Sequence, residues 1–114
     1  MTDCIFCKIA QGEIPAAKVY EDEQAMAFSD INPKAPIHIL IIPRRHIPTL
    51  LEIKDQDRDL VAHLHQVANQ IAVEKGLSDR GFRLVVNCKA EAGQEVYHLH
   101  FHLLGGRKMN WPPG

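Results

Sequence analysis

The sequence feature that most constrains the fold is a two-residue alternation in the segment YHLHFHLL, residues 97–104. Histidines and apolar residues take turns along this segment: His98, His100 and His102 alternate with Leu99, Phe101 and Leu103. Because successive side chains of a β-strand point to opposite faces, the alternation predicts a strand with one apolar and one imidazole face. Ordinary solvated strand faces draw mostly on Lys, Glu, Thr and Ser. Three histidines in step therefore indicate a functional site.

The other elements are predicted from similar patterns. Strand-like composition also occurs at residues 19–21, 25–29, 37–43 and 82–88. The apolar period then changes to that of an amphipathic helix over residues 55–75, with one face formed by Leu60, Leu64, Val67 and Ile71. A short helix is predicted over residues 4–11, and glycines follow both helices as stops.

This order of elements predicts an α+β fold. We expect an antiparallel sheet of about five strands, one main helix and a short N-terminal helix, with the helices on one face of the sheet. The 114 residues suffice for a core without disulfide bonds, so we expect one domain, residues 1–114.

Composition narrows the classes of partner. The formal net charge is −1 and the basic residues are scattered, which argues against a nucleic-acid or membrane surface. The N-terminal MTDCIFCK has an acid and no long apolar stretch, unlike a signal peptide. Three cysteines cannot all pair within the chain. We therefore expect a reduced, cytoplasmic protein, in which Cys4 and Cys7 are thiols available to a metal.

Two chemistries could use the three histidines. A single metal ion is disfavoured as the ligand of all three, because residues i to i+4 of a strand span roughly 13 Å. Nucleophilic attack on phosphorus is favoured, because a neutral imidazole approaches a phosphate without charge repulsion. Neighbouring imidazoles disfavour multiple protonation, so one ring can attack while another serves the leaving group.

At this point the sequence resembles a known family. HLHFHLL matches the His-φ-His-φ-His-φ-φ signature of the histidine triad (HIT) superfamily, where φ is an apolar residue. Flanking segments, including AFSDINPKAPIHILIIPRRHI, GQEVYHLHFHLLGGR and the closing WPPG, extend the resemblance over nearly the whole chain. Together they look like the histidine triad nucleotide-binding (Hint) branch, the bacterial-like purine nucleoside phosphoramidases.

The resemblance implies roles for individual residues. His100 matches the nucleophile, His98 and His102 match its flanking triad members, and His38 matches a fourth active-site histidine. The residues that match nucleotide contacts are Asp30 at the ribose hydroxyls, Asn87, Gly93, Glu95 and Val96 around the phosphate and ribose, and Ile5, Phe6, Phe28 and Ile31 at the base. From the residues alone, Asp30 also fits a turn, and Phe6 and Phe28 also fit the core.

One position departs from the animal branch of the family. Where that branch has a serine, this chain has Glu95, a feature of bacterial-looking relatives. A serine hydroxyl can donate a hydrogen bond to a phosphate oxygen or leaving group, and an ionised glutamate cannot. The reaction class is expected to persist, while the preference for the leaving group is open.

The cysteine pair suggests a metal site. Cys4-x-x-Cys7 has the spacing of metal ligands, although one such pair alone is a weak signal and two unligated thiols are the alternative. In related branches a matching pair joins two histidines around zinc, and the matching positions here are His46 and His98. Such a structural zinc would also fix the ring of His98 beside the nucleophile.

The function expected from the sequence is hydrolysis of purine nucleoside phosphoramidates or adenylates through a nucleotidyl-histidine, with no cofactor needed for the chemistry. Two alternatives stay open: a dinucleoside polyphosphate hydrolase or nucleotidyl transferase of the same superfamily, and a non-catalytic nucleotide-binding regulatory module. The family precedent is a homodimer. Trp111, near the C-terminus, fits a tail that reaches the partner or a frayed end.

Overall fold

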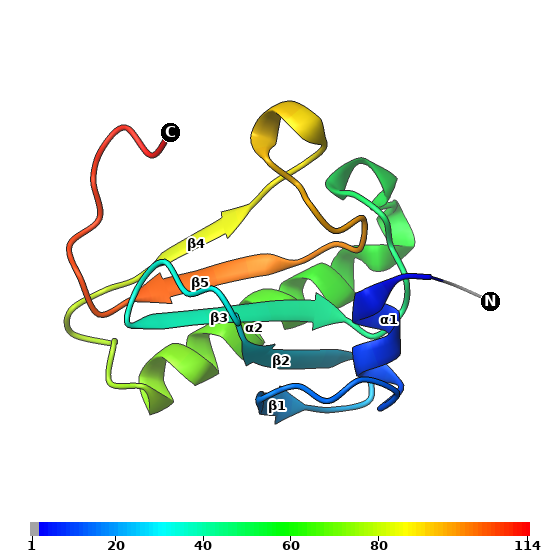
Figure 1. The fold of residues 1–114 in the computed structure, drawn as a ribbon, viewed down its shortest axis with the longest axis horizontal. Coiled ribbons are helices and arrows are strands. Elements are labelled where there is room, and N and C mark those ends of the chain that lie inside the picture. Colours follow the sequence, from blue (N-terminus) through cyan, green and yellow to red (C-terminus); the bar gives the residue numbers. More distant parts are fainter. Residues whose placement is uncertain (1–2) are drawn as a thin grey trace.

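The computed structural model describes residues 3–114 and contains one five-stranded antiparallel sheet in the order β1-β2-β3-β5-β4 (Figure 1). The strands are β1 (Lys18–Glu21), β2 (Ala25–Ser29), β3 (Ile37–Pro43), β4 (Arg83–Val86) and β5 (Phe101–Gly105). The helices are α1 (Ile5–Ala10) and α2 (Arg58–Glu74), with short 3-10 turns at Leu50–Glu52, Asp55–Asp57 and Ala90–Ala92. The predicted α+β fold, with its main helix and short N-terminal helix, is confirmed.

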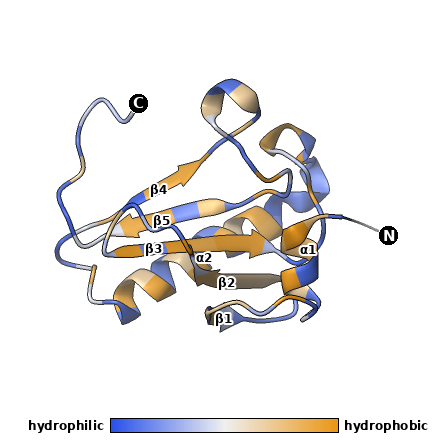
Figure 2. Cartoon of the chain, in the orientation of Figure 1, coloured by the Kyte–Doolittle hydropathy of each residue, from blue (hydrophilic) through white to orange (hydrophobic). Residues whose placement is uncertain are grey.

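The larger core lies between α2 and one face of the sheet. The helix contributes Leu64, Val67 and Ile71, and the predicted apolar face is confirmed. Alternate residues of the strands meet it, among them Ile41 and Leu103. Figure 2 shows β3 hydrophobic along most of its length, whereas β5 mixes hydrophobic and hydrophilic positions. The main helix therefore covers the apolar face that the alternation in β5 predicts.

The short helix packs on the opposite face, so the expectation that both helices share one face is wrong. Phe6 and Ile9 of α1 join Met26, Phe28 and Leu40 of the central strands in a second core cluster. The burial of β2 explains this arrangement: residues 25–28 are all buried, whichever face they point to. A strand that is apolar on both faces needs cover on both.

Strand β5 begins later than the alternation predicts. Residues 97–100 lie outside the strand, although their side chains keep alternating between the two faces. Extending the register of β3 and β5 would set Pro43 opposite Leu99. Pro43 has no N–H to donate, and its carbonyl accepts from Nε2 of His98 (2.8 Å). Leu99 instead donates its N–H to the carbonyl of Ile47 (2.6 Å).

The main helix also starts later than predicted. Residues 55–57 form a 3-10 turn, closed by the Asp57 carboxylate, which accepts from the N–H of Lys54 (2.9 Å). The α-helix ends before Gly76, whose φ of +76° is readily adopted only by glycine. Among the described residues, 3–114, neither helix has the length and apolar character needed to cross a bilayer.

Candidate active site

The three histidines of the alternation, here called the histidine row (His98, His100 and His102), share the face of the sheet that carries α1. The side chains of His98 and His100 are buried and that of His102 is half-buried. The rings of His100 and His102 are neighbours, with centroids 5.0 Å apart. The residues that alternate with the three histidines, Leu99, Phe101 and Leu103, lie in the core beneath α2. The predicted division into two faces is therefore what the structure has.

The ring of His100 is held in one tautomer. Its Nδ1 lies 2.8 Å from the backbone carbonyl of His98. A carbonyl only accepts hydrogen bonds, so Nδ1 must carry the proton. In the neutral ring Nε2 then keeps its lone pair, and within the described residues it makes no hydrogen bond. The sequence thus builds a buried imidazole with one fixed and one available nitrogen.

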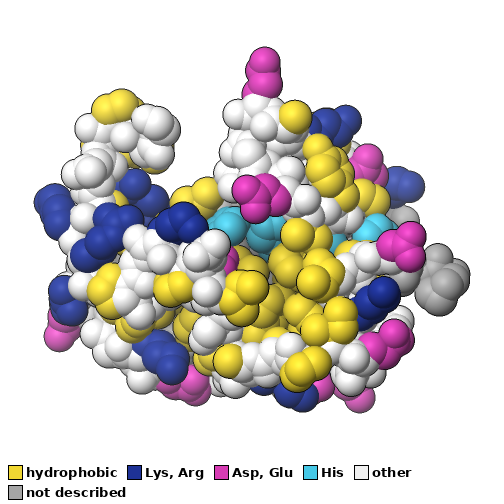
Figure 3. Space-filling view, viewed as in Figure 1, with side chains coloured by type: hydrophobic (Ala, Val, Ile, Leu, Met, Phe, Trp, Pro, Cys, Tyr) yellow, Lys and Arg dark blue, Asp and Glu magenta, His cyan; other side chains and the backbone are white. Residues whose placement is uncertain are grey.

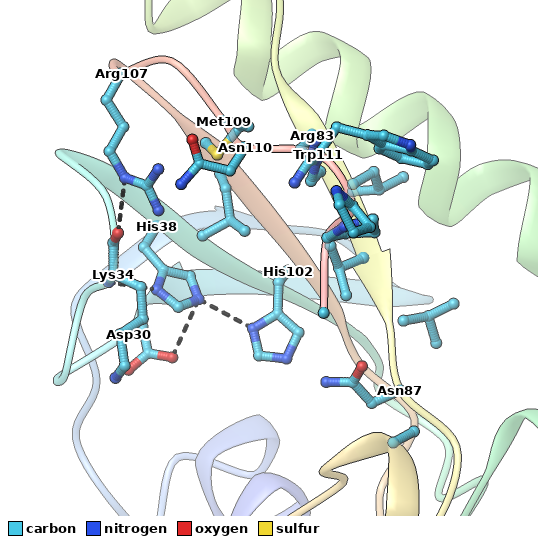
Figure 4. A pocket seen from close by; sticks show the side chains of 18 of the residues that line it. Asp30, Lys34, His38, Arg83, Asn87, His102, Arg107, Met109, Asn110 and Trp111 are labelled. Carbon is cyan, nitrogen blue, oxygen red and sulfur yellow. Dashed lines mark hydrogen bonds and ion pairs between the residues drawn. The ribbon is translucent and has the colours of Figure 1, made fainter.

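A second chain of hydrogen bonds fixes the neighbouring rings (Figure 4). The N–H of Lys34 donates to Nδ1 of His38 (3.0 Å), so a neutral His38 carries its proton on Nε2. That Nε2 lies 3.0 Å from Nδ1 of His102 and 3.4 Å from the carboxylate of Asp30. When Nε2 of His38 donates to His102, Nε2 of the neutral His102 is left as a proton donor.

The surroundings keep these rings neutral in the unliganded protein. Burial, followed by the charges of His100 and His38, lowers the pKa of His102 to about 4. Burial also lowers the pKa of His38. A ring with such a pKa is uncharged at neutral pH, which suits approach to an anionic substrate.

An apolar patch borders the histidine side chains that reach the surface (Figure 3). Phe6 and Phe28 are buried, and their rings meet edge to face with centroids 5.5 Å apart. The ring of Phe6 also contacts that of His100 at 5.1 Å. Ile5 is 45% exposed and Ile31 is 99% exposed, and neither belongs to the buried cluster of Phe6 and Phe28. The four residues predicted at a base pocket thus supply two buried rings and two exposed aliphatic side chains.

A cleft of about 1180 Å³, lined by polar and apolar residues alike, opens beside His102. It is lined by three of the predicted polar contacts, Asp30, Asn87 and Glu95, together with His38. Gly93 and Val96 belong to the same loop as Glu95 but do not line this cleft, and Gly93 has a positive φ of +92°. The buried ring of His100, an apolar surface and a cleft therefore lie side by side.

Comparisons with known proteins agree with this geometry. Residues 3–111 match the family model described as "Scavenger mRNA decapping enzyme C-term binding". An uncharacterized HIT-like protein of Synechocystis is 51% identical over 112 residues, which cover 98% of this chain and 97% of the relative. The chain belongs to the HIT-like family.

Solved structures of HIT proteins share its fold. The crystal structure of a HIT family hydrolase from Legionella pneumophila Philadelphia 1 is 55% identical, with a TM-score of 0.97, and the alignment covers 98% of this chain and 100% of the other. A histidine triad nucleotide-binding protein from Candida albicans is 34% identical, with a TM-score of 0.83 and coverages of 96% and 83%.

The HIT-like chain also brings the four predicted metal ligands together. The ligand atoms of Cys4, Cys7, His46 and His98 all lie within 4.8 Å of one another. Both histidines present Nδ1, 3.2 Å apart, and Sγ of Cys7 lies 3.3 Å from Nδ1 of His46 and 3.5 Å from that of His98. Bond lengths of about 2.0–2.3 Å in a tetrahedron around zinc give ligand separations of about 3.3–3.8 Å. The donor set therefore fits zinc.

One buried residue of this HIT-like site was missed by sequence reasoning. Gln94 is 5% exposed and bonds to both ends of the loop that contains Glu95. The residue stands in the family-like segment GQEVYHLHFHLLGGR, but nothing in its neighbours predicts that it points inward. Its contacts lie up to 46 residues away along the chain, where no local pattern reaches.

Proposed function

We propose that the chain hydrolyses purine nucleoside phosphoramidates and related adenylates through a covalent nucleotidyl-histidine. The observation that carries this proposal is the state of His100. Its Nδ1–H is held by the His98 carbonyl, so its Nε2 lone pair is available to phosphorus in a pocket of neutral rings. A fixed tautomer spares the nucleophile a proton transfer before it attacks.

In the first step, Nε2 of His100 attacks the α-phosphorus of the substrate and the bond from phosphorus to the leaving nitrogen breaks. The ring then carries a positive charge, because Nδ1 keeps its proton. The His98 carbonyl, 2.8 Å from that nitrogen, stabilises the charge. Phosphate bound beside His102 raises the pKa of this ring, so the ring takes up a proton from solvent on substrate binding and gives that proton to the departing amine.

In the second step, water attacks the same phosphorus and the bond to Nε2 of His100 breaks, which releases the nucleoside monophosphate and restores the neutral ring. His102 takes up the proton of the water and releases it to solvent when the product leaves, which restores the neutral ring of the unliganded protein. Asp30 binds the ribose hydroxyls, and the side chains of Phe6, Phe28, Ile5 and Ile31 contact the base. Asn87 and the backbone of Gly93, Glu95 and Val96 contact the phosphate and ribose.

The similar proteins support this proposal at a coarser level. The Legionella relative is called a hydrolase, and the Candida relative is called nucleotide-binding. Both descriptions fit a protein that binds a nucleotide beside a nucleophilic histidine. The finer choice of a phosphorus–nitrogen bond depends on the resemblance to the Hint branch.

Steady-state turnover of an adenosine phosphoramidate tests the activity. Wild type should release AMP, and His100→Ala should still bind AMP with turnover reduced by at least about 10⁴-fold. His65→Ala is the matched control, because His65 is exposed on α2, where its Nδ1 donates to the carbonyl of Val61 and its ring packs on Phe101, on the face of the sheet opposite to the histidine row. Wild type that binds AMP without turnover would instead indicate the regulatory module.

The decapping family model favours one alternative, cleavage of a dinucleoside polyphosphate, since residues 3–111 match it. Both reactions would use the same nucleophile and differ in the leaving group. Parallel kcat/KM measurements with an adenosine phosphoramidate and a dinucleoside polyphosphate separate them. A higher value for the polyphosphate would overturn the phosphoramidase proposal and leave the covalent mechanism in place.

We also propose that Cys4, Cys7, His46 and His98 hold a structural zinc ion. Burial raises the pKa of the Cys7 thiol to about 11, so a cation is needed to hold it as a thiolate at neutral pH. Bound zinc would supply that charge and would join the start of α1 to the segment after β3 and to His98. Protein purified without chelator should contain about one zinc per chain by elemental analysis, with the metal lost in Cys4→Ser and kept in Cys88→Ser. Metal-free wild type would contradict this proposal.

We further propose a homodimer, following the family precedent. Strand β4 supports it, because within residues 3–114 β4 is an edge strand whose single neighbour is β5. Trp111, 81% exposed, supports a tail that contacts the partner. Light scattering should give about twice the chain mass of 12.9 kDa, and a monomeric mass at micromolar concentration would contradict the proposal.

A further inference from the structure

We propose that Gln94 is a positioning residue, which holds the loop over residues 89–96 in the form that stabilises the transition state at phosphorus. This inference rests on the function proposed above and assigns part of its catalytic power to one buried amide. Gln94 lies one residue from Glu95, which lines the cleft beside His102.

The side chain of Gln94 bridges the two ends of the loop. Its Oε1 accepts from the N–H of Lys89 (2.8 Å), and its Nε2 donates to the carbonyl of Val96 (3.0 Å). Nε2 also donates to the carbonyl of Pro48 (2.9 Å), which lies beyond the end of β3. The side chain therefore uses both of its amide donors and its carbonyl, and it is 5% exposed.

The loop has little else to hold it. Its residues from Lys89 to Gly93 are exposed, so no packed side chain fixes them. Lys89 has a positive φ of +70°, a conformation that costs energy for a residue with a side chain. Backbone bonds from Gly93 to Ala90 (3.0 Å) and from Gln94 to Lys89 (3.1 Å) close single turns within the loop. The Gln94 amide connects residues 89–93 to the rest of the protein, while Val96 at the end of the loop packs beside the α1 cluster.

What the bridge holds in place is a pair of backbone donors. Among residues 3–114, the N–H groups of Glu95 and Val96 donate to no protein acceptor. Val96 packs beside the α1 cluster, while Glu95 faces the cleft, so the two groups lie between the apolar patch and His102. Donors at such a place stabilise the charge that builds up on phosphate oxygens as His100 attacks.

The Gln94 bridge should strengthen binding of the transition state and have little effect on binding of the substrate. The base and ribose contacts proposed for Phe6 and Asp30 come from other elements, and they do not depend on the bridge. Loss of the bridge should therefore lower kcat while KM and the affinity for AMP change little. A merely structural role would lower the amount of folded protein and leave kcat per folded molecule unchanged.

Gln94→Met tests this, because methionine has a similar volume and no hydrogen-bonding amide. We expect kcat to fall about 10- to 100-fold with KM within about threefold of wild type. Binding of adenosine with orthovanadate, a mimic of pentacoordinate phosphorus, should weaken by a similar factor while AMP binding is kept. Thr49→Val is the matched control: Thr49 is also buried and hydrogen-bonded, next to Pro48, but caps a different turn.

The outcomes are distinguishable. An unchanged kcat in Gln94→Met, or an equal loss of vanadate and AMP binding, would overturn the inference. Should wild type show no turnover, the proposed function fails, and the vanadate comparison alone decides the role of Gln94.

If Gln94→Met does not fold, amide exchange in wild type keeps the inference testable. The side-chain NH₂ protons of buried Gln94 should exchange with solvent at least about 100-fold more slowly than those of exposed Gln70. Equal exchange rates would overturn the inference, because they would show an amide that is not held.

Discussion

Two polar clusters on different parts of the molecule differ in one respect that separates function from stability. One is the histidine row beside α1. The other, here called the Asp22 cluster, consists of Tyr20, Asp22 and His63 and joins the β1–β2 turn to α2. In the Asp22 cluster one carboxylate takes four hydrogen bonds, from Tyr20 (2.5 Å), His63 (2.6 Å) and two backbone N–H groups (2.7 and 2.8 Å). In the histidine row, Nε2 of His100 makes none within the described residues.

A structural cluster is therefore distinguished by having all of its hydrogen-bonding capacity used within the protein, and not by the presence of titratable groups. A fully bonded carboxylate has no capacity left for a ligand. A ring with one nitrogen fixed and the other bonded to no described residue has that capacity, and the second nitrogen is open to solvent, since no buried side-chain nitrogen of the described residues lacks a partner. Substitutions in the two clusters should therefore affect different properties of the protein.

The largest expected effect is on activity. His100→Ala should lower kcat/KM by at least about 10⁴-fold, because it removes the proposed nucleophile. His63→Ala, the matched substitution in the Asp22 cluster, should leave kcat/KM within about twofold, since His63 lies on α2 away from the site. Steady-state kinetics checks both. A similar loss in the two variants would remove the distinction between the clusters.

The next effect is on stability. Asp22→Asn should lower the free energy of unfolding by about 2 kcal/mol, the size expected for hydrogen bonds to a charged group. Turnover of the folded fraction should be unchanged. Urea denaturation followed by circular dichroism measures the difference, and a change below about 0.5 kcal/mol would show that the cluster does not stabilise the fold.

The same carboxylate predicts a dependence on pH. Burial favours the neutral acid, but the four hydrogen bonds outweigh it and hold the pKa of Asp22 well below its usual value. Its stabilising contribution is therefore complete above the unfolded pKa of about 3.9 and is lost as the pH falls toward the folded value. The gap in unfolding free energy between wild type and Asp22→Asn should narrow between pH 5 and pH 3. A constant gap would contradict the lowered pKa.

The smallest expected effect concerns the histidine row, where a ligand should change the pKa of His102. In the free protein the ring of His102 has a pKa of about 4, lowered by burial and then by its histidine neighbours. Bound AMP brings negative charge beside this ring and should raise its pKa by one unit or more, a differential interaction of about 1.4 kcal/mol. Nuclear magnetic resonance titration of the His102 ring with and without AMP measures the shift. A midpoint near 6.5 in the free protein would contradict the neutral pocket.

The elements that the sequence predicts well are those with local signals. The period of Leu64, Val67 and Ile71 identifies α2, and the alternation around His100 identifies both faces of β5. The residues predicted at the phosphate side came from the family resemblance, and the structure brings Asn87 and Glu95 to one cleft with His102.

Features that depend on contacts distant in the chain were not predictable. The late start of β5 depends on Pro43, which stands 58 residues before Phe101. It also depends on the side chain of His98, which donates a hydrogen bond to the Pro43 carbonyl. The inward position of Gln94 depends on Pro48 in the same way. The pattern of β2 could have indicated a helix on each face. Met26 and Phe28 make one face of this strand apolar, and Ala25 and Ala27 make the other face apolar.

The most direct test of the central claim is identification of the residue that carries the nucleotide. Wild type mixed with excess adenosine phosphoramidate should be quenched within milliseconds, digested and analysed by mass spectrometry under conditions that preserve phosphorus–nitrogen bonds. We predict an added adenylyl group on the peptide that contains residues 97–104, attached to His100 and missing in His100→Ala. Rapid AMP release with no adenylyl group on that peptide, or with the group on His98 or His102, would contradict the account.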